Sequence, residues 1–432
     1  MGFSILLYNI GLFLALLFLI PMFLLWSFFV PKIHAGFKQK LGLYDLETLR
    51  KFEKKDGRPR VWFHAVSVGE FNAIRPLLTM SMERYDVVVS TTTLTGQDLA
   101  KRTFPELPVL YFPYDIRPCI HSAFKLVKPD LVVIAETELW PNFIDIVTRK
   151  YKKPLIFING RLSRRSLKGY RWIQPIISST LQRVDHWYMQ SQADAERLSS
   201  LVEIDPERMT VVGNIKFDLA THVDPLKRAL LKELLNFKDS DAVLVFASTH
   251  AGEEQILLDG YLQLKRDFPE LKLIIAPRHP ERLPSIKALL NSLALSYSVR
   301  SQLSEESPNL SPIIILDTIG ELLTVYSLST VAVMGGSFVD KGGQNPLEAI
   351  SQRVPVVFGP HMENFFEIAR LIREAKAGYQ AQNIHELLYA VTALLTQPEE
   401  YDTTAEKGLQ MLENNRGARK VLLHGIEQIL TS

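Results

Sequence analysis

The sequence predicts an α/β protein made of two Rossmann-like domains that face each other across a cleft, preceded by an N-terminal transmembrane helix. Short apolar runs alternate with polar, helix-forming stretches from residue 61 onward, a pattern typical of α/β sheets. A charged segment without a strand pattern, residues 219–241, divides these runs into two sets. A long uncharged segment precedes both sets.

Size and composition exclude several classes of protein. An ordinary domain takes ~100–200 residues, so the 432 residues suffice for two domains. The 47% hydrophobic and 22% charged residues exclude a disordered or fibrous chain. A net charge of +2 lacks the basic excess of a typical DNA-binding protein, so no nucleic-acid partner is expected. The single cysteine, Cys119, excludes a disulfide framework and a cysteine-rich zinc site.

Residues 1–31 form the predicted membrane anchor. The 26 residues from 5 to 30 carry no charge and are rich in Leu and Phe, and a bilayer core of ~30 Å needs ~20 apolar helical residues. Pro21 is tolerated in a spanning helix, and Trp26 lies where an interfacial aromatic residue is expected. The alternatives are a hairpin of buried core and a cleaved signal peptide. A signal peptide would need a basic start and a small-residue cleavage site, and neither is evident.

The charges around this segment predict its orientation. Residues 31–60 contain nine Lys or Arg and four Asp or Glu, whereas residues 1–30 contain no Lys or Arg. Positively charged flanks stay on the cytoplasmic side of a membrane, so we expect a single-pass protein with its folded domains in the cytoplasm. The same basic segment is expected to contact anionic headgroups, at ~1 kcal/mol per Lys or Arg near the surface.

Strands are predicted where short apolar runs rich in β-branched residues occur, because such runs are typical of parallel strands buried on both faces. The first set comprises residues 61–64, 86–90, 109–112, 131–135, 155–158 and 186–189. The second set comprises residues 243–247, 271–276, 313–316, 331–334 and 355–358. Residues 32–220 and 221–432 are therefore the predicted N-terminal and C-terminal domains. The final stretch, residues 403–430, is helical by composition, and its last helix is free to pack back on the N-terminal domain.

Carboxylates follow two strands of the first domain, at the ends where ligands bind in open parallel sheets. Glu70 opens a helix after the first predicted strand, and Glu136 and Glu138 follow the fourth, on the same side of the chain. The structural alternatives are stabilisation of a carboxylate by a helix dipole or pairing with an arginine. The common location of Glu70, Glu136 and Glu138 at strand ends makes these carboxylates candidate site residues. Lys216, at the end of the domain, can reach a negative charge that develops in the cleft.

Residues 161–171 contain five basic residues and no acidic residue. This run predicts a site for a phosphate or an anionic headgroup. A solvated helix face is the alternative interpretation.

The second domain carries residues suited to binding an anion. Residues 248–254 connect a strand to a helix start, and helix N-termini bind phosphate, although Ser or Thr there is equally an ordinary cap. Arg278 follows the next strand, and its guanidinium group can donate two parallel hydrogen bonds to a phosphate. The glycine-rich residues 335–343 provide backbone amides for a phosphate, and Glu348 could hold ribose hydroxyls.

Missing motifs exclude other chemistries. The sequence has no G-x-G-x-x-G and no Walker A motif, which argues against dinucleotide enzymes and P-loop kinases, and it has no H-E-x-x-H zinc motif. The D-x-D at residues 239–241 precedes its strand in a charged linker and is interpreted as a solvated loop. No metal is expected.

Eight motifs occur along the chain. In the first domain they are SVGE at 67–70, ETELWPN at 136–142, GRLS at 160–163 and GNIKFD at 213–218. In the second they are PRHPER at 277–282, GEL at 320–322, GGS at 335–337 and NPLE at 345–348. Together with the N-terminal anchor, and over essentially the whole chain, this ordered set resembles the 3-deoxy-D-manno-octulosonic acid (Kdo) transferases of lipopolysaccharide and lipid A biosynthesis, which have the glycosyltransferase-B fold.

The resemblance implies an inverting glycosyltransferase that moves Kdo from CMP-Kdo to a lipid A precursor, lipid IVA, and releases CMP. It implies that the protein works at the cytoplasmic face of the inner membrane, with CMP-Kdo, the lipid A precursor and the membrane as partners and without a cofactor or metal. The N-terminal domain would hold the acceptor and the base, and the C-terminal domain would bind the nucleotide sugar.

The resemblance also implies roles for individual residues. Glu70 would be the general base, and Glu138 and Lys216 would stabilise the transition state. CMP would bind to Pro277, Arg278, Ile319, Gly320, Glu321, Asn345, Pro346, Leu347 and Glu348.

Two other functions remain open from the sequence. One is a different membrane-anchored glycosyltransferase of the same fold that uses a UDP-sugar. The other is a non-catalytic, membrane-tethered binder of nucleotide sugars or headgroups. The three candidate catalytic residues disfavour the binder, but their spacing alone does not exclude it.

Overall fold

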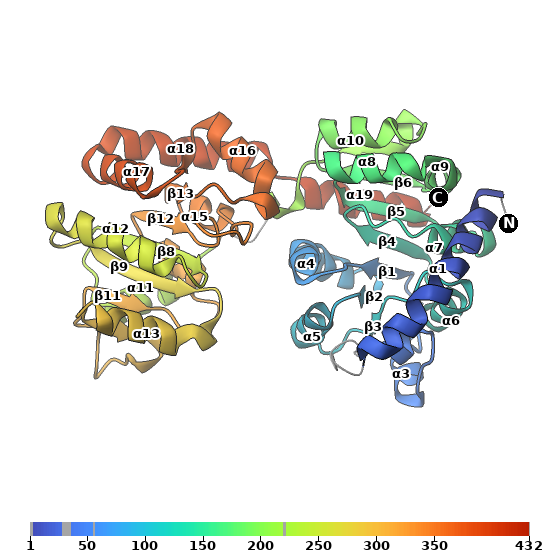
Figure 1. The fold of residues 1–432 in the computed structure, drawn as a ribbon, viewed down its shortest axis with the longest axis horizontal. Coiled ribbons are helices and arrows are strands. Elements are labelled where there is room, and N and C mark those ends of the chain that lie inside the picture. The colour runs from blue at the N-terminus through green and yellow to red at the C-terminus, as the bar shows by residue number, and fades with distance from the viewer. Residues whose placement is uncertain (1–2, 28–35, 55–56, 219–221, 432) are drawn as a thin grey trace. The chain divides into compact units, whose positions relative to one another are not determined.

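The computed structural model describes residues 3–27, 36–54, 57–218 and 222–431, and for residues 3, 18–27, 164 and 165 it describes the backbone alone. The chain forms two compact α/β units (Figure 1). The first unit comprises residues 1–219 and 416–432, and the second comprises residues 220–415. The predicted boundary between residues 220 and 221 lies outside the described residues.

The first unit is built on a seven-stranded parallel sheet with the order β3-β2-β1-β4-β5-β6-β7. In the central strand β1, Phe63 lies opposite Val89 of β2 and Val133 of β4. Trp62 packs into the core on one face of the sheet and Phe63 into the core on the other, as expected for a sheet covered on both faces. The strands are β1 (Arg60–His64), β2 (Asp86–Thr91), β3 (Val109–Tyr111), β4 (Leu131–Ala135), β5 (Leu155–Gly160), β6 (His186–Met189) and β7 (Met209–Val211).

Helices cover both faces of this sheet. The last helix, α19, packs against α4 and against the short 3₁₀ helix η4 (Ile215–Asp218), and buries Leu422 and Ile426 in the core that contains Phe71. In Figure 1 the red α19 lies among the blue and green elements of the first unit. The helices are α1 (Phe3–Ser27), α2 (Phe37–Lys40), α3 (Leu46–Lys51), α4 (Val68–Met82), α5 (Leu94–Thr103), α6 (Arg117–Val127), α7 (Pro141–Asp145), α8 (Arg164–Trp172), α9 (Gln174–Leu181), α10 (Gln192–Ser199) and α19 (Ala418–Thr431).

The second unit repeats this plan with the order β10-β11-β9-β8-β12-β13-β14, again all parallel. Its strands are β8 (Val243–Thr249), β9 (Lys272–Pro277), β10 (Tyr297–Val299), β11 (Ile313–Ile315), β12 (Val331–Met334), β13 (Val356–Phe358) and β14 (Gly378–Gln380). Its helices are α11 (Pro225–Leu234), α12 (Glu254–Asp267), α13 (Leu283–Ser292), α14 (Leu322–Tyr326), α15 (Leu347–Ser351), α16 (Phe366–Ala375), α17 (Ile384–Thr396) and α18 (Pro398–Asn414).

The prediction of two α/β domains with parallel sheets is confirmed. Every predicted apolar run forms a strand, and β4, β6 and β12 have the predicted bounds. The sequence analysis missed β7, β10 and β14, which are three residues long and lie at sheet edges. An edge strand has only one neighbour and keeps partly exposed side chains, so it needs no continuous apolar run.

The N-terminal helix α1 packs on the first unit. It contacts α7 and α9, Ile5 is only 3% exposed, and two of its polar side chains hydrogen-bond to the same unit. Within the described residues, none of the helices combines the length and the apolar character needed to cross a membrane. The predicted transmembrane helix over residues 1–31 therefore lacks support there, and residues 1–2 and 28–31 of that prediction lie outside the described part.

Candidate active site

The loops after β1 and β4 lie at the point where the strand order of the first sheet reverses. Strands β1 and β4 are hydrogen-bonded neighbours, whereas the chain runs from β1 through β2 and β3 before it returns to β4. Ligands in open α/β sheets bind at such a switch point, beyond the carboxyl ends of the strands. Glu70 follows β1, and Glu136 and Glu138 follow β4.

Glu70 lies in the first turn of α4 and is partly buried. Ser67 caps this helix, and the Glu70 carboxylate accepts hydrogen bonds from the Val66 amide (2.7 Å) and the Ser67 hydroxyl (3.1 Å). Glu70 therefore does have the structural role of completing a helix cap. Burial, together with the negative charges of Glu136 and Glu138, nevertheless raises its pKa to about 7. A carboxylate with a pKa near neutral pH is suited to general base catalysis.

Glu136 is a member of this cluster that the sequence analysis did not select as a catalytic residue. Its φ of 57° lies in the left-handed region, which is uncommon for a residue with a side chain and costs backbone free energy. Its amide donates to the Ile158 carbonyl of β5 (2.9 Å), which holds the turn against the sheet. Its negative charge raises the pKa of Glu70 and, after the larger effect of burial, that of Glu138. The available signal was its position immediately after a fully buried strand.

Lys216 joins the carboxylates from η4. The Asn159 side chain accepts a hydrogen bond from the Ile215 amide (3.1 Å), and Asn214 accepts one from the Lys216 amide (3.0 Å), so the turn is fixed by side chains. Burial lowers the pKa of Lys216, whereas the charges of Glu136 and Glu70 raise it. The structure thus brings the three predicted residues Glu70, Glu138 and Lys216 together in one unit, around Glu136.

The basic run at residues 161–171 divides into two parts. Arg161 lies next to the cluster: its amide donates to Thr137 (2.9 Å), and its charge lowers the pKa of Lys216. Lys168 and Arg171 lie on α8 and are exposed. The side chains of residues 164 and 165 lie outside the described part, so the proposed phosphate contacts stay a prediction.

The second unit has a corresponding switch point between β8 and β12, and the side chain of Glu253 lies between the loops that follow these two strands. Glu253 is fully buried and accepts hydrogen bonds from the amides of Gly336 (2.7 and 2.9 Å) and His250 (2.6 Å). The loops lie so close that a Cβ on Gly335 would come within 2.4 Å of the Ser248 carbonyl oxygen. The expectation that the amides of this glycine-rich turn cradle a phosphate is therefore wrong for Gly336, because Glu253 already uses that amide.

Several residues predicted to bind the nucleotide lie on loops at the carboxyl edge of the second sheet. Pro277 is the buried last residue of β9. Arg278 follows it, and the Arg278 amide donates to the Thr249 carbonyl (3.0 Å). Ile319, Gly320 and Glu321 follow β11 and line a cavity of about 420 Å³. Glu321 forms an ion pair there with Arg300 (2.7 Å).

The remaining predicted nucleotide residues, 345–348, precede or begin α15. The Asn345 side chain accepts a hydrogen bond from the Leu347 amide (3.2 Å) and so caps the turn. Leu347 is only 1% exposed, so its side chain is a core residue and only its backbone is available to a ligand. Pro346 is the N-cap of α15, and Glu348 lies in its first turn.

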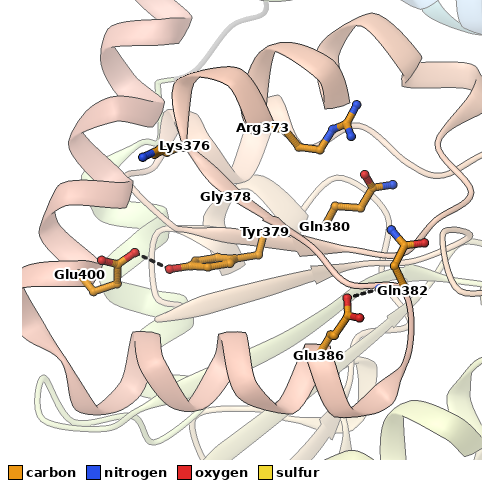
Figure 2. A pocket seen from close by; sticks show the side chains of 8 residues that line it. All are labelled: Arg373, Lys376, Gly378, Tyr379, Gln380, Gln382, Glu386 and Glu400. Carbon is orange, nitrogen blue, oxygen red and sulfur yellow. Dashed lines mark hydrogen bonds between the residues drawn. The ribbon is translucent and has the colours of Figure 1, made fainter.

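A second cavity of the second unit, about 460 Å³, lies beside the edge strand β14 (Figure 2). None of the predicted site residues lines it. The Tyr379 hydroxyl donates to Glu400, and the Gln382 amide donates to Glu386 (2.9 Å), so polar groups in its wall pair with one another. We assign no function to this cavity.

Among the described residues, one group of side chains has the spacing of a metal site. Potential ligand atoms of Asp340, His361 and Glu363 lie within 4.8 Å of one another. Asp340 and Glu363 are exposed, and exposed acidic groups are common without a bound ion. The expectation that the enzyme needs no metal stays a prediction.

The fold defines the class of protein. Solved structures with the same architecture include a UDP-GlcNAc 2-epimerase from Neisseria meningitidis, with a TM-score of 0.57 at 15% identity over 85% of this chain and 100% of that one. A glycosyltransferase from Rickettsia africae matches with a TM-score of 0.57 at 12% identity over 87% of this chain and 98% of that one. Identities this low show the fold alone, which is that of glycosyltransferase-B-like proteins: two α/β units, each built on a parallel sheet.

Sequence comparisons identify the family. The family model described as 3-deoxy-D-manno-octulosonic-acid transferase (kdotransferase) matches residues 35–219. The 3-deoxy-D-manno-octulosonic acid transferase of Haemophilus influenzae is 34% identical over 84% of this chain and 85% of its own length. The 3-deoxy-D-manno-octulosonic acid transferase of Chlamydophila psittaci is 31% identical over 93% of this chain and 94% of its own length. The chain therefore belongs to the Kdo transferase family of glycosyltransferases.

One further relative is longer than this chain. The bifunctional glycosyltransferase/methyltransferase of Fusobacterium nucleatum is 36% identical over 77% of this chain. The match covers 52% of that protein, so this chain spans about half of its length.

Proposed function

We propose that this chain transfers Kdo from CMP-Kdo to a lipid A precursor, with inversion at the anomeric carbon and release of CMP. The observation that carries the proposal is the cluster of Glu70, Glu136, Glu138 and Lys216 at the switch point of the first sheet. Family membership supports Kdo as the transferred sugar, and the cluster supplies the acid–base and charge-stabilising groups that a direct displacement needs.

Glu70 is the proposed general base. With its pKa raised to about 7, it is ionised in a large fraction of molecules at neutral pH and still basic enough to accept a proton. It takes the proton of the acceptor hydroxyl while that oxygen attacks the anomeric carbon of the donor. The bond between this carbon and the phosphate oxygen of CMP breaks, and the electron pair leaves on the phosphate.

Lys216 is the proposed partner of the negative charge that develops during the displacement. The Glu136 and Glu70 charges oppose the effect of burial on its pKa and so favour the protonated form. The negative charge of Glu136 thereby raises the pKa of both the proposed base, Glu70, and Lys216. Glu138 adds a further negative charge beside Glu136.

The donor nucleotide is assigned to the second unit. We propose that the loops at residues 277–278, 319–321 and 345–348 hold CMP, with the Leu347 contact made through its backbone. Arg278 supplies a positive charge for the phosphate, and the cavity beside Gly320 is large enough for part of a nucleotide. No metal or other cofactor takes part in this proposal.

We propose that the protein works at the cytoplasmic face of the inner membrane, because its acceptor is a lipid. Exposed apolar side chains of α1, including Leu6, Ile10, Phe13 and Leu14, form a surface suited to lipid. Lys168 and Arg171 on α8 are exposed and suited to anionic headgroups.

A mass spectrum of the lipid product tests the proposed reaction. Purified protein in detergent is incubated with CMP-Kdo and a Kdo-free tetraacylated lipid A precursor, without added metal. We expect the lipid mass to increase by whole Kdo units, and no increase with CMP-Kdo replaced by UDP-sugars. An unchanged lipid mass from protein that is folded and stabilised by CMP would refute the acceptor. Thermal stabilisation by UDP and not by CMP would refute the donor.

A further inference from the structure

The first turns of α1 carry the polar side chains of Ser4, Tyr8 and Asn9 within a largely apolar helix. Neighbouring side chains such as Leu6, Leu7 and Ile10 are 43–48% exposed. Tyr8 and Asn9 are instead partly buried, and both hydrogen-bond to the first unit. The helix therefore has one face that is fitted to the protein by specific polar contacts.

Tyr8 bonds to a carboxylate that caps α7. Its hydroxyl donates to Asp115 Oδ2 (2.8 Å), and Asp115 is only 7% exposed. The same carboxylate accepts the amides of Asn142 (3.1 Å) and Phe143 (2.8 Å), which are the first free amides of α7. Asp115 thus joins the N-terminal helix to the start of α7.

Asn9 forms a reciprocal pair with Asn142. The Asn9 amide group donates to Asn142 Oδ1 (2.8 Å), and the Asn142 amide group donates to Asn9 Oδ1 (2.9 Å). Asn142 is completely buried, and its amide group also donates to the Asp115 carbonyl (2.8 Å). Buried polar groups require hydrogen-bond partners, and Asn9 is the residue that satisfies the Asn142 side-chain oxygen.

These contacts hold α7, which directly follows the loop that carries Glu136 and Glu138. The loop with Glu136 and Glu138 starts at the end of β4 and ends where α7 begins, at Pro141. Strand β4 fixes one end of this loop, and α7 fixes the other. Since α7 starts only three residues after Glu138, a shift of α7 is transmitted to the carboxylates.

We infer that α1 is a positioning element of the active site: Tyr8 and Asn9 hold α7, and α7 holds the loop that carries Glu136 and Glu138. The inference rests on the proposed role of this loop in the reaction. Tyr8 and Asn9 are positioning residues because they act through Asp115 and Asn142. The N-terminal helix would therefore have a second role besides its proposed contact with lipid.

The test uses the full chain in detergent with Tyr8→Phe and Asn9→Leu combined, which removes both contacts and keeps the helix apolar. Gly11→Ala is the matched control, since a Cβ there meets no atom within 4 Å. We expect faster hydrogen exchange at residues 136–145 in the double variant and a fall in kcat of about tenfold or more, because small misplacements of catalytic groups are costly. The KM for CMP-Kdo should not change, since the donor is assigned to the other unit.

The pH profile separates positioning from simple loss of folded protein. The acidic limb of kcat reports Glu70, which responds to Glu136 and Glu138 and lies in one electrostatic cluster with Lys216 and Arg161. A loosened loop weakens the effect of Glu136 and Glu138, so the limb should move to lower pH in the double variant, whereas partial unfolding would lower the rate without moving it.

Unchanged exchange, kcat and pH limb in the double variant, with an active wild type, would overturn the inference. An inactive wild type would instead count against the proposed function. The exchange comparison between the double variant and Gly11→Ala would still decide whether α1 holds the loop.

Discussion

The switch points of the two sheets each contain a glutamate whose pKa is raised to about 7, mainly by desolvation, yet the two residues differ in exposure and in what surrounds them. Glu253 is fully buried and takes amides from the two loops that it joins. Glu70 is partly exposed and lies among two other carboxylates and a lysine. A perturbed pKa alone therefore does not identify a catalytic residue, and access together with neighbouring charges distinguishes the proposed base from the structural group.

Glu70→Gln should cause the largest fall in kcat, and it tests most directly whether Glu70 is the catalytic member of the two glutamates. The amide keeps the shape of the side chain but cannot accept the proton of the acceptor hydroxyl, so kcat should fall by about 10²–10⁴-fold. Thermal stabilisation by CMP should remain, because CMP is assigned to the second unit. A variant that keeps wild-type turnover would remove Glu70 from the mechanism.

Lys216→Ala should cause the second largest fall in kcat. Loss of a group that stabilises the developing negative charge is expected to lower kcat by about 10²–10³-fold. Lys216→Arg is the matched variant, which keeps the charge, and it should recover part of the rate. If both variants turned over equally well, charge stabilisation by Lys216 would be refuted.

Glu253→Gln should change stability and leave turnover nearly intact. The raised pKa means that the folded chain binds more protons than the unfolded chain between the ordinary value of 4.5 and about 7. The stabilisation by this group is therefore fully present below 4.5 and is lost as the pH rises through 7, by about 1–3 kcal/mol. The free energy of unfolding from denaturant titrations at pH 5 and 7.5 should differ less in the variant than in the wild type.

Glu136→Gln should move the acidic limb of the kcat/KM profile. Glu136 is the negative charge with the larger effect on Glu70, so its removal lowers the pKa of Glu70 and shifts the limb to lower pH by up to about one unit. Glu253→Gln is the control and should leave the limb near pH 7. An unshifted limb would show that Glu136 does not act on the base.

The smallest expected effect is that of metal removal. Treatment with a chelator should leave the rate unchanged, because the proposed mechanism uses Lys216 and not a metal to stabilise the leaving phosphate. Restoration of a lost rate by a divalent cation would contradict this prediction and direct attention to Asp340, His361 and Glu363.

The sequence predicts the buried parts of this molecule better than its edges and turns. Inner strands such as β4 and β12 can be predicted from the sequence because both of their faces are apolar. The edge strand β14 has no buried residue and therefore no continuous apolar run to reveal it. Glu70 and Glu138 could be found because they follow such strands. Glu136 follows the same strand as Glu138, but its effect on the pKa values of Glu70 and Glu138 depends on a proximity in space that the sequence does not show.

Long-range contacts account for the errors in the second unit. The amide of Gly336 is taken by Glu253, which lies 83 residues away in the sequence, and no local pattern predicts that bond. Likewise, Leu347 belongs to a conspicuous motif, but the fold uses its side chain to fill the core.

The helix α19 has a consequence for how the protein is made. The first unit contains residues from both ends of the chain, and the second unit is inserted between them. The side chains of Leu422 and Ile426 complete the core around Phe71. During synthesis, the core around Phe71 therefore stays incomplete when the strands of the first unit have emerged from the ribosome. It is completed only after the inserted unit and α19 have been translated.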